Sequence, residues 1–333
     1  MSRLAALRAG EDFGPDAVEP RRPSGTGPRL GLALGGGSAR GWAHIGVIRA
    51  LEEADLYPSV VAGCSIGAVV AGCYAAGKLD LLESFALGLT KRRVMGLLDL
   101  RLTGSGLIGG DRLRRRLVQD LSDRRIEDLR VRFAAVATEL GTGHEVWLSR
   151  GPLVEAVRAS YALPGIFPPV ALDGRLLMDG TLVNPVPVAL ARAMGADLVV
   201  CVNLNCDPSV RGGLIEPDPA DPVERAVAGA VEVRRRWSLL GAVRGRRHRA
   251  REPAPSAPGI ARVMFDAFNI TQDRISRARL ERDPPDVSVR PELAGMGLFE
   301  FHRAAEGIAL GRAAARAALP RIRAALDGAS ART

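Results

Sequence analysis

The pentapeptide Gly63-Cys64-Ser65-Ile66-Gly67 decides the fold that this sequence predicts. Before it, Val60-Val61-Ala62 is a short β-branched run that is typical of a buried strand. After it, apolar residues recur at helical spacing as far as Gly77, where a helix commonly ends. A serine on a sharp turn between a strand and a helix exposes its hydroxyl, and flanking glycines permit the tight backbone. The stretch therefore predicts a nucleophile elbow centred on Ser65.

The same stretch admits two other interpretations. Residues 56–77 carry no charge and are long enough for a membrane span of ~20 residues. Gly63 and Gly67 also have the spacing of a motif through which membrane helices pair. In the second interpretation, Ser65 is a structural residue in an ordinary strand-turn-helix. Residues elsewhere in the chain have to discriminate among these readings.

Composition sets the broad class of the protein. The 333 residues, 47% of them hydrophobic, can form one large α/β domain or two small ones. The formal charge of +9 rests almost wholly on arginine, since Lys78 and Lys91 are the only lysines. That bias fits genome composition as well as nucleic-acid binding, which we therefore do not infer. The four cysteines have no zinc spacing and no secretory signal precedes them, so a cytoplasmic protein with buried thiols is expected.

Strands and helices are predicted to alternate along the chain. Residues 1–29 are rich in Pro, Gly and charge and are expected to be disordered, while residues 30–333 form one domain. A flexible basic insertion is expected at about 207–260, followed by a C-terminal strand and helix. Strands are predicted over 30–34, 60–62, 131–138, 144–148, 170–172, 175–178, 197–204 and 286–289, and helices over 80–89, 111–121, 153–161 and 301–319. This order predicts an α/β fold with a central, mostly parallel sheet flanked by helices in three layers.

A glycine-rich loop follows the first predicted strand. Gly35-Gly36-Gly37 follows a strand and opens a helix, so its backbone N–H groups can point at one spot. Ser38 and Arg40 are assigned with these glycines to an oxyanion hole, where Arg40 can pin the loop or add charge nearby. The rival interpretation is a dinucleotide site, but Arg40 stands where that motif requires its third glycine. Asp55, the corresponding ribose-binding acid, comes before the next strand and not at its end.

A nucleophilic serine also needs a base. Asp179 is the stronger candidate, because it ends a predicted hairpin strand and Gly180 beside it permits close backbone approach. The order Ser65, Asp179, His302 also fits a triad, although His302 begins a predicted helix and does not follow a strand. Of the other histidines, His248 lies in the arginine-rich segment, and His44 and His144 are more often structural in such positions.

Several ordered motifs together resemble the patatin-like phospholipase family, and most closely its bacterial branch related to neuropathy target esterase. They span residues 30–204 and are Gly35-Gly36-Gly37-Ser38-Ala39-Arg40-Gly41, Trp42-Ala43-His44-Ile45-Gly46-Val47, Gly63-Cys64-Ser65-Ile66-Gly67, Ala159-Ser160-Tyr161-Ala162-Leu163-Pro164-Gly165-Ile166-Phe167-Pro168-Pro169, Asp179-Gly180 and Asn184-Pro185-Val186-Pro187. Thr181 departs from the family, which often has Gly or Ala at that place.

The resemblance implies a Ser65–Asp179 dyad without histidine, an oxyanion hole from the glycine-rich loop, and hydrolysis of acyl esters in phospholipids or lysophospholipids. No cofactor or metal is expected. A different function remains open, in which the fold serves a regulatory protein whose segment 233–251, with eight arginines and no acid, contacts anionic membrane or nucleic acid. Nucleic acid is the less favoured partner, and peripheral contact with the inner membrane surface is compatible with the expected cytoplasmic location.

Overall fold

The sheet at the centre of the fold contains eight strands among the residues that the structure describes. This computed structural model describes residues 27–97, 99, 106, 108–121, 124–204 and 260–331. The strands are β1 (Leu30–Leu34), β2 (Val60–Cys64), β3 (Arg132–Glu139), β4 (Glu145–Leu148), β5 (Val170–Leu172), β6 (Arg175–Asp179), β7 (Leu198–Val202) and β8 (Val287–Val289). Each lies within about two residues of a predicted strand, because each is a short apolar run bounded by turn residues.

The sheet is mostly parallel. Its strand order is β5-β6-β3-β2-β1-β7-β8, and β4 also pairs with β3. The neighbours β3, β2, β1, β7 and β8 run parallel to one another, whereas β4 and β6 are antiparallel to β3. The carboxyl ends of the parallel strands therefore meet at one edge, where ligands of such sheets commonly bind. The expected fold class is confirmed.

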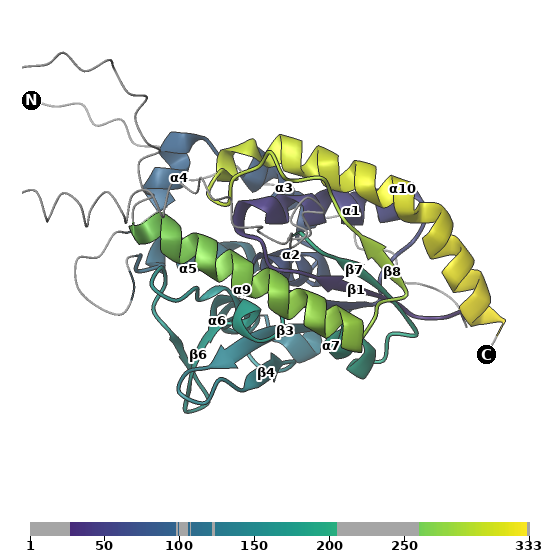
Figure 1. Ribbon diagram of the computed structural model, residues 1–333, viewed down its shortest axis with the longest axis horizontal. Coiled ribbons are helices and arrows are strands. Elements are labelled where there is room, and N and C mark those ends of the chain that lie inside the picture. Colours follow the sequence, from purple (N-terminus) through teal and green to yellow (C-terminus); the bar gives the residue numbers. More distant parts are fainter. Residues whose placement is uncertain are drawn as a thin grey trace, which may run out of the picture. The chain divides into compact units, whose positions relative to one another are not determined.

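Helices cover both faces of the sheet (Figure 1). They are α1 (Trp42–Glu53), α2 (Ile66–Ala75), α3 (Leu79–Leu87), α4 (Lys91–Leu97), α5 (Asp111–Leu121), α6 (Leu153–Tyr161), α7 (Val188–Ala193), α9 (Ile260–Arg282) and α10 (Ala304–Ser330). Single 3-10 turns are η1 (Ser38–Gly41), η2 (Ile126–Asp128), η3 (Gly180–Leu182) and η4 (Phe301–Arg303).

Alternation along β2 divides the core into two layers. Val60 and Ala62 belong to a buried cluster that includes residues of α7 and is contacted by Leu280 of α9. Val61 points to the other side, into a larger cluster built with α1, α2, α6 and α10. Because successive strand residues face opposite sides, these two clusters are the two faces of one sheet between helical layers.

Residues 56–77 fold into β2 and α2 and not into one long helix. All of β2 and most of α2 are buried in the core, which explains why the stretch carries no charge. Within the described residues no helix has the length and apolar character needed to cross a membrane. The membrane-span interpretation of this stretch is therefore wrong.

Three helices differ from the sequence predictions. Helix α9 precedes the last strand, in a stretch for which the sequence predicted no helix. Helix α4 was not predicted either. Helix α10 continues through Pro320 to Ser330 and does not end at residue 319. Most of the predicted disordered segment, His248, Cys206 and the arginine-rich segment 233–251 lie outside the described residues. Cys64, Cys73 and Cys201 are buried and are not joined in disulfides, as expected.

Candidate active site

Ser65 occupies the sharp turn between β2 and α2. Its backbone has φ 55° and ψ −125°, a left-handed conformation that is uncommon for a residue with a side chain. Close packing maintains this turn, because a Cβ added at Gly67 would lie 2.1 Å from the carbonyl oxygen of Leu34. At Gly63, it would lie 2.4 Å from Cα of Ala68. The nucleophile elbow expected around Ser65 is therefore present in its backbone geometry.

Strand register brings Asp179 to Ser65. Cys64, the last residue of β2, pairs with Val136 of β3. The next residue of β3, Ala137, pairs with Asp179 at the end of β6. Strand β6 therefore takes over the pairing with β3 at the residue where β2 stops. This places Asp179, the last residue of β6, next to Ser65, the first residue after β2.

The two side chains are in direct contact. The Ser65 hydroxyl donates to Asp179 Oδ2 over 2.6 Å, and Asp179 is 1% exposed. Burial raises the pKa of Asp179 from 3.8 to about 6, while hydrogen bonds from Ser65 and Thr181 lower it. A carboxylate with a raised pKa accepts a proton more readily at neutral pH than an ordinary aspartate does.

Every polar atom of Asp179 has a partner. Its amide donates to the carbonyl of Ala162 over 2.9 Å, and its own carbonyl accepts from the Thr138 hydroxyl over 2.8 Å. Oδ1 accepts from the amide and the hydroxyl of Thr181, over 2.8 and 2.7 Å. Only Oδ2 is directed at Ser65, so the carboxylate has one orientation.

The end of α6 holds both residues of the pair. The buried Ser160 hydroxyl accepts a hydrogen bond from the Ser65 amide over 2.9 Å. Two residues further on, Ala162 supplies the carbonyl that binds the Asp179 amide. The sequence motif that begins at Ala159 therefore has a local function, since it fixes the distance between the two side chains.

Thr181 and Gln272 extend the site beyond the residues that the sequence singled out. The Thr181 hydroxyl, which donates to Asp179, accepts from Nε2 of Gln272 over 2.9 Å. Gln272 lies on α9 and is 5% exposed. Thr181 departs from the family pattern, which was the one available signal, but nothing in the sequence marked Gln272. Gly180, between Asp179 and Thr181 in the chain, packs against β3, where an added Cβ would lie 2.3 Å from the carbonyl oxygen of Val136.

The glycine-rich loop offers fewer free amides than its sequence suggested. The amides of Gly35 and Gly36 donate to the carbonyls of Val202 and Pro185, over 3.1 and 3.0 Å. The Arg40 amide donates to the Gly37 carbonyl, and the Arg40 side chain donates to the carbonyl of Met296 over 2.8 Å. Arg40 therefore secures the loop. These three amides already have acceptors, which removes them from the set of available oxyanion donors.

The remaining amides of the loop are those of Gly37 and Ser38. Neither has a hydrogen-bond acceptor in the described part of the chain. Ile66 begins α2 directly after Ser65, so its amide also has no partner within the helix. The sequence reading missed Ile66, although the residue after the nucleophile commonly supplies one such donor.

No histidine contacts the pair within the described residues. His44 is fully buried on α1, where Nε2 lies 2.7 Å from the Gly35 carbonyl oxygen. Burial lowers the pKa of His44 from 6.5 to about 4, so the ring is neutral and donates to that carbonyl. His302 lies in η4, and it is not a hydrogen-bond partner of Ser65 or Asp179. The described contacts give the triad interpretation no support.

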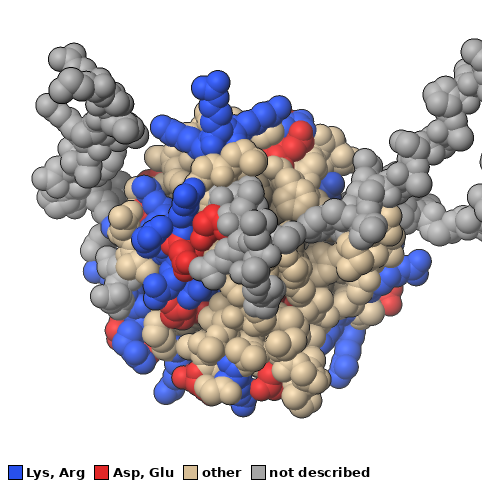
Figure 2. Space-filling view, turned by 90° about the vertical axis from the view of Figure 1, so that its left-hand side faces the viewer, with Lys and Arg blue, Asp and Glu red and all other residues tan. Residues whose placement is uncertain are grey.

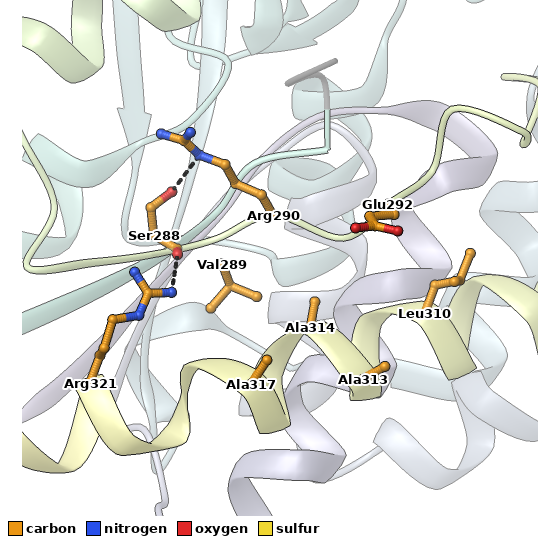
Figure 3. A pocket seen from close by; sticks show the side chains of 9 residues that line it. All are labelled: Ser288, Val289, Arg290, Glu292, Leu310, Ala313, Ala314, Ala317 and Arg321. Carbon is orange, nitrogen blue, oxygen red and sulfur yellow. Dashed lines mark hydrogen bonds between the residues drawn. The ribbon is translucent and has the colours of Figure 1, made fainter. Parts of the chain in front are cut away.

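Ser288 of β8 lies at an open hollow between β8 and α10, and its hydroxyl points to the side of the strand away from α10 (Figure 3). The hollow has a volume of about 590 Å³, and Ser288 and Arg321 contribute to its wall. The Ser288 hydroxyl accepts from Arg290 over 3.3 Å, and its carbonyl accepts from Arg321. The hydroxyl also accepts from the Cys201 thiol over 3.5 Å. Because its partners are a cation and a thiol donor and not a base, Ser288 is no rival to Ser65 as a nucleophile.

Comparisons with known proteins show the family of this chain. The family model described as patatin-like phospholipase matches residues 32–192. An uncharacterized NTE family protein from Mycobacterium tuberculosis (strain ATCC 25618 / H37Rv) is 34% identical over 329 residues, covering 88% of this chain and 91% of the relative. Lysophospholipase nte1 from Emericella nidulans is 28% identical over 281 residues, which cover 83% of this chain but only 17% of that protein.

Among solved structures, human GIVD cytosolic phospholipase A2 in complex with a fluorophosphonate inhibitor aligns with a TM-score of 0.38. The alignment has 13% sequence identity and covers 92% of this chain and 60% of that one. So low a TM-score supports no argument about the site, and the sequence relatives carry the family assignment.

Proposed function

Because this chain belongs to the patatin-like phospholipase family, in its NTE branch, we propose that it is a serine hydrolase that cleaves acyl esters of phospholipids or lysophospholipids. The observation that carries the proposal is the 2.6 Å hydrogen bond between Ser65 and the buried Asp179. Lipid ester hydrolysis is the activity of the family, whereas the roles of these two residues are our assignment.

The proposed reaction begins with proton transfer from Ser65 to Asp179. As Ser65 Oγ forms its bond to the ester carbonyl carbon, its proton moves to Oδ2 of Asp179. The bond to the leaving alcohol then breaks, and Asp179 returns the proton to that oxygen. A water molecule, deprotonated by the same carboxylate, then attacks the acyl carbon. The bond to Ser65 Oγ breaks, Asp179 returns the proton to that oxygen, and the fatty acid leaves. The raised pKa of Asp179, about 6, suits both directions of transfer.

The proposed oxyanion donors are the amides of Gly37 and Ser38, with that of Ile66 at the start of α2. The loop amides have no described acceptor, and the helix N-terminus favours developing negative charge. Each such donor contributes on the order of 3 kcal/mol to transition-state stabilisation in comparable sites. Gly35, Gly36 and Arg40 then act by fixing the loop through the bonds described above.

The substrate class follows the relatives. Those named lysophospholipases support a single-chain phospholipid, and the family model supports phospholipids in general. We further propose a cytoplasmic enzyme that makes peripheral contact with anionic membrane through the arginine-rich segment 233–251, which lies outside the described residues. No observation favours nucleic acid as a partner.

The test is covalent labelling by a fluorophosphonate probe, in which Ser65 Oγ bonds to phosphorus and fluoride leaves. Wild type is expected to react, Ser65→Ala to show no labelling, and Asp179→Asn to react at least 100-fold more slowly, as ~10² is typical for loss of a general base. Release of fatty acid from lysophosphatidylcholine and from phosphatidylcholine then distinguishes the two substrate classes.

Thermal unfolding of each variant provides the control for folding. A folded wild type that neither labels nor releases fatty acid contradicts the proposed function. Labelling that survives in Ser65→Ala assigns the nucleophile to another residue.

A further inference from the structure

A chain of hydrogen bonds leads from α9 to the proposed base. Gln272 donates to Thr181, and Thr181 donates to Asp179. We propose that Thr181 and Gln272 are positioning residues that fix the orientation and proton affinity of Asp179, an inference that rests on the hydrolysis proposed above. Neither residue touches the reacting atoms, so both act through the carboxylate.

The chemistry of the three groups gives this chain one direction. An amide nitrogen has hydrogens to donate and does not accept, so Gln272 Nε2 uses a lone pair of the Thr181 oxygen. The Thr181 hydrogen is then directed to Asp179 Oδ1 over 2.7 Å. With Oδ1 engaged in this way, Oδ2 is the oxygen that receives the Ser65 proton.

The relay is dry. Asp179 and Thr181 are each 1% exposed, and Gln272 is 5% exposed. Hydrogen bonds are stronger in such surroundings, and consecutive bonds polarise one another. The methyl group of Thr181 contributes packing as well, because a Cβ added at Gly36 would lie 2.3 Å from Thr181 Cγ2.

A second contact holds α9 in place. Arg279, two turns beyond Gln272, pairs with Glu145 of β4 over 2.9 Å. Glu145 also accepts from the Asn184 side chain over 2.7 Å. The helix that carries Gln272 is therefore also fixed to β4, and this second contact keeps Gln272 beside Thr181.

The relay has a predictable effect on protonation. A hydrogen bond to a carboxylate favours its charged form, and the bonds from Thr181 lower the pKa of Asp179 against the effect of burial. Removing the Thr181 hydroxyl therefore raises this pKa further. The base then becomes ionised, and thus active, only at higher pH.

Three ionisable groups with shifted pKa values, Cys64, Tyr161 and His44, keep one charge state near pH 6. On β2, burial and the carboxylates of Asp179 and Glu145 raise the pKa of the Cys64 thiol. On α6, burial raises the pKa of Tyr161. Glu145 is paired with Arg279, and on α1 burial lowers the pKa of His44 to about 4. The acid limb of a pH–rate profile is the part in which the rate rises with pH as the base ionises. A change in this limb near pH 6 therefore reports on Asp179.

The experiment measures the rate constant of fluorophosphonate labelling between pH 4.5 and 9. In wild type this rate is expected to rise with an apparent pKa of about 6. Thr181→Val is expected to move the acid limb about one unit to higher pH, since a hydrogen bond to a charged group has about that effect. Gln272→Leu is expected to shift it in the same direction by less, because the hydroxyl remains but loses its orientation. Thr181→Ser is expected to restore the wild-type limb.

Thr138→Val is the matched control. It also removes a buried hydroxyl that bonds to Asp179, but the bond goes to the backbone carbonyl and not to the carboxylate. A merely structural role for Thr181 predicts that both valine variants lose thermal stability and that neither moves the acid limb. If Thr181→Val does not fold, Thr181→Ala removes the same hydroxyl with a smaller side chain.

An unmoved acid limb in folded Thr181→Val or Thr181→Ala, or in Gln272→Leu, overturns the relay while the proposed hydrolysis stands. A wild type that shows no Ser65-dependent labelling at any pH instead refutes the proposed hydrolysis. The two failures are therefore distinguishable in one set of measurements.

Discussion

The buried carboxyl group of Asp179 links protonation to the stability of the fold. Its pKa is raised from 3.8 to about 6, so the folded state pays for ionisation and stability falls as pH rises from 4 to 6. The cost corresponds to about 3 kcal/mol at pH 7.5. Asp179→Asn keeps the shape without the charge. We therefore expect it to be more stable than wild type by about that amount at pH 7.5 and to differ little at pH 4, measured by urea unfolding.

Protonation of His44 also changes the stability of the wild type with pH, so the prediction concerns the difference in stability between Asp179→Asn and wild type. The pKa of His44 is lowered from 6.5 to about 4, so the folded state resists protonation and stability rises with pH over that interval. This opposes the effect of Asp179 in wild type. Because His44 is the same in both proteins, it cancels in the difference. A difference between Asp179→Asn and wild type that does not change with pH contradicts the prediction.

The contribution of the Ser160 hydroxyl to the stability of the elbow can be measured separately. Ser160→Ala leaves the Ser65 amide without its acceptor. We expect a loss of about 1–3 kcal/mol in the free energy of unfolding, and slower labelling of Ser65, because the elbow is less fixed. Ser59→Ala is the control, since the buried Ser59 hydroxyl has no hydrogen-bond partner among the described residues. Equal losses in the two variants contradict this role for Ser160.

The sequence predicted the central pair of side chains but not the residues that hold them. Ser65 and Asp179 belong to short motifs in which flanking glycines reveal the backbone requirement. Gln272 has no such signature, because its partner Thr181 is 91 residues away in the chain. The distribution of amides in the glycine-rich loop was equally unpredictable. It depends on which carbonyls of β7 and of the turn before α7 approach the loop.

At the scale of elements, the contact between α1 and α10 depends on glycine. A Cβ added at Gly311 of α10 would lie 1.9 Å from the carbonyl oxygen of Ala43 on α1. Gly311→Ala has to separate two backbones, so we expect a loss of about 1–3 kcal/mol or more in stability, measured as a fall in melting temperature.

Gly328 provides the control on the same helix. A Cβ added there meets no atom within 4 Å. Gly328→Ala should stabilise the helix by about 0.5–1 kcal/mol, because alanine loses less backbone entropy than glycine. If both substitutions stabilise the protein, the close contact between the helices is not required.

The predicted elements succeeded where hydrophobic periodicity was clear. Strands such as β1 and β7 are uninterrupted apolar runs. Helix α9 was missed because its apolar residues do not form one stripe. Val263, Met264 and Ile270 are 49%, 67% and 62% exposed, so hydrophobicity does not mark its buried side. The sequence predicted that the last helix ends at residue 319, before Pro320, because proline usually ends a helix. In the structure, α10 passes through Pro320.

At the scale of the molecule, charge is distributed unevenly along the chain. In the described part, many arginines are paired with carboxylates, as Arg49 is with Glu52 and Glu83. Figure 2 shows basic and acidic side chains interspersed on one face. Segment 233–251 is different, because its eight arginines have no acidic residue among them. It therefore accounts for most of the formal charge of +9.

This distribution predicts that the arginine-rich segment, and not the surface of the described residues, attracts anionic membrane. The arginines are Arg234, Arg235, Arg236, Arg244, Arg246, Arg247, Arg249 and Arg251. Replacing all eight by Gln lowers the formal charge from +9 to +1, since 9 − 8 = 1. Each basic residue near an anionic surface contributes about 1 kcal/mol. We therefore expect sedimentation with phosphatidylglycerol vesicles at low salt to be lost, while sedimentation with phosphatidylcholine vesicles stays low.

Replacement of the same arginines by lysine keeps the charge and should retain this binding, which weakens with added salt as exposed charges are screened. Hydrolysis of a dissolved short-chain ester should be the same in all three proteins, because the segment is assigned to attraction and not to chemistry. Vesicle binding that persists in the glutamine variant would place the attracting charge outside segment 233–251. A parallel loss of soluble-ester hydrolysis would instead tie the segment to the proposed active site.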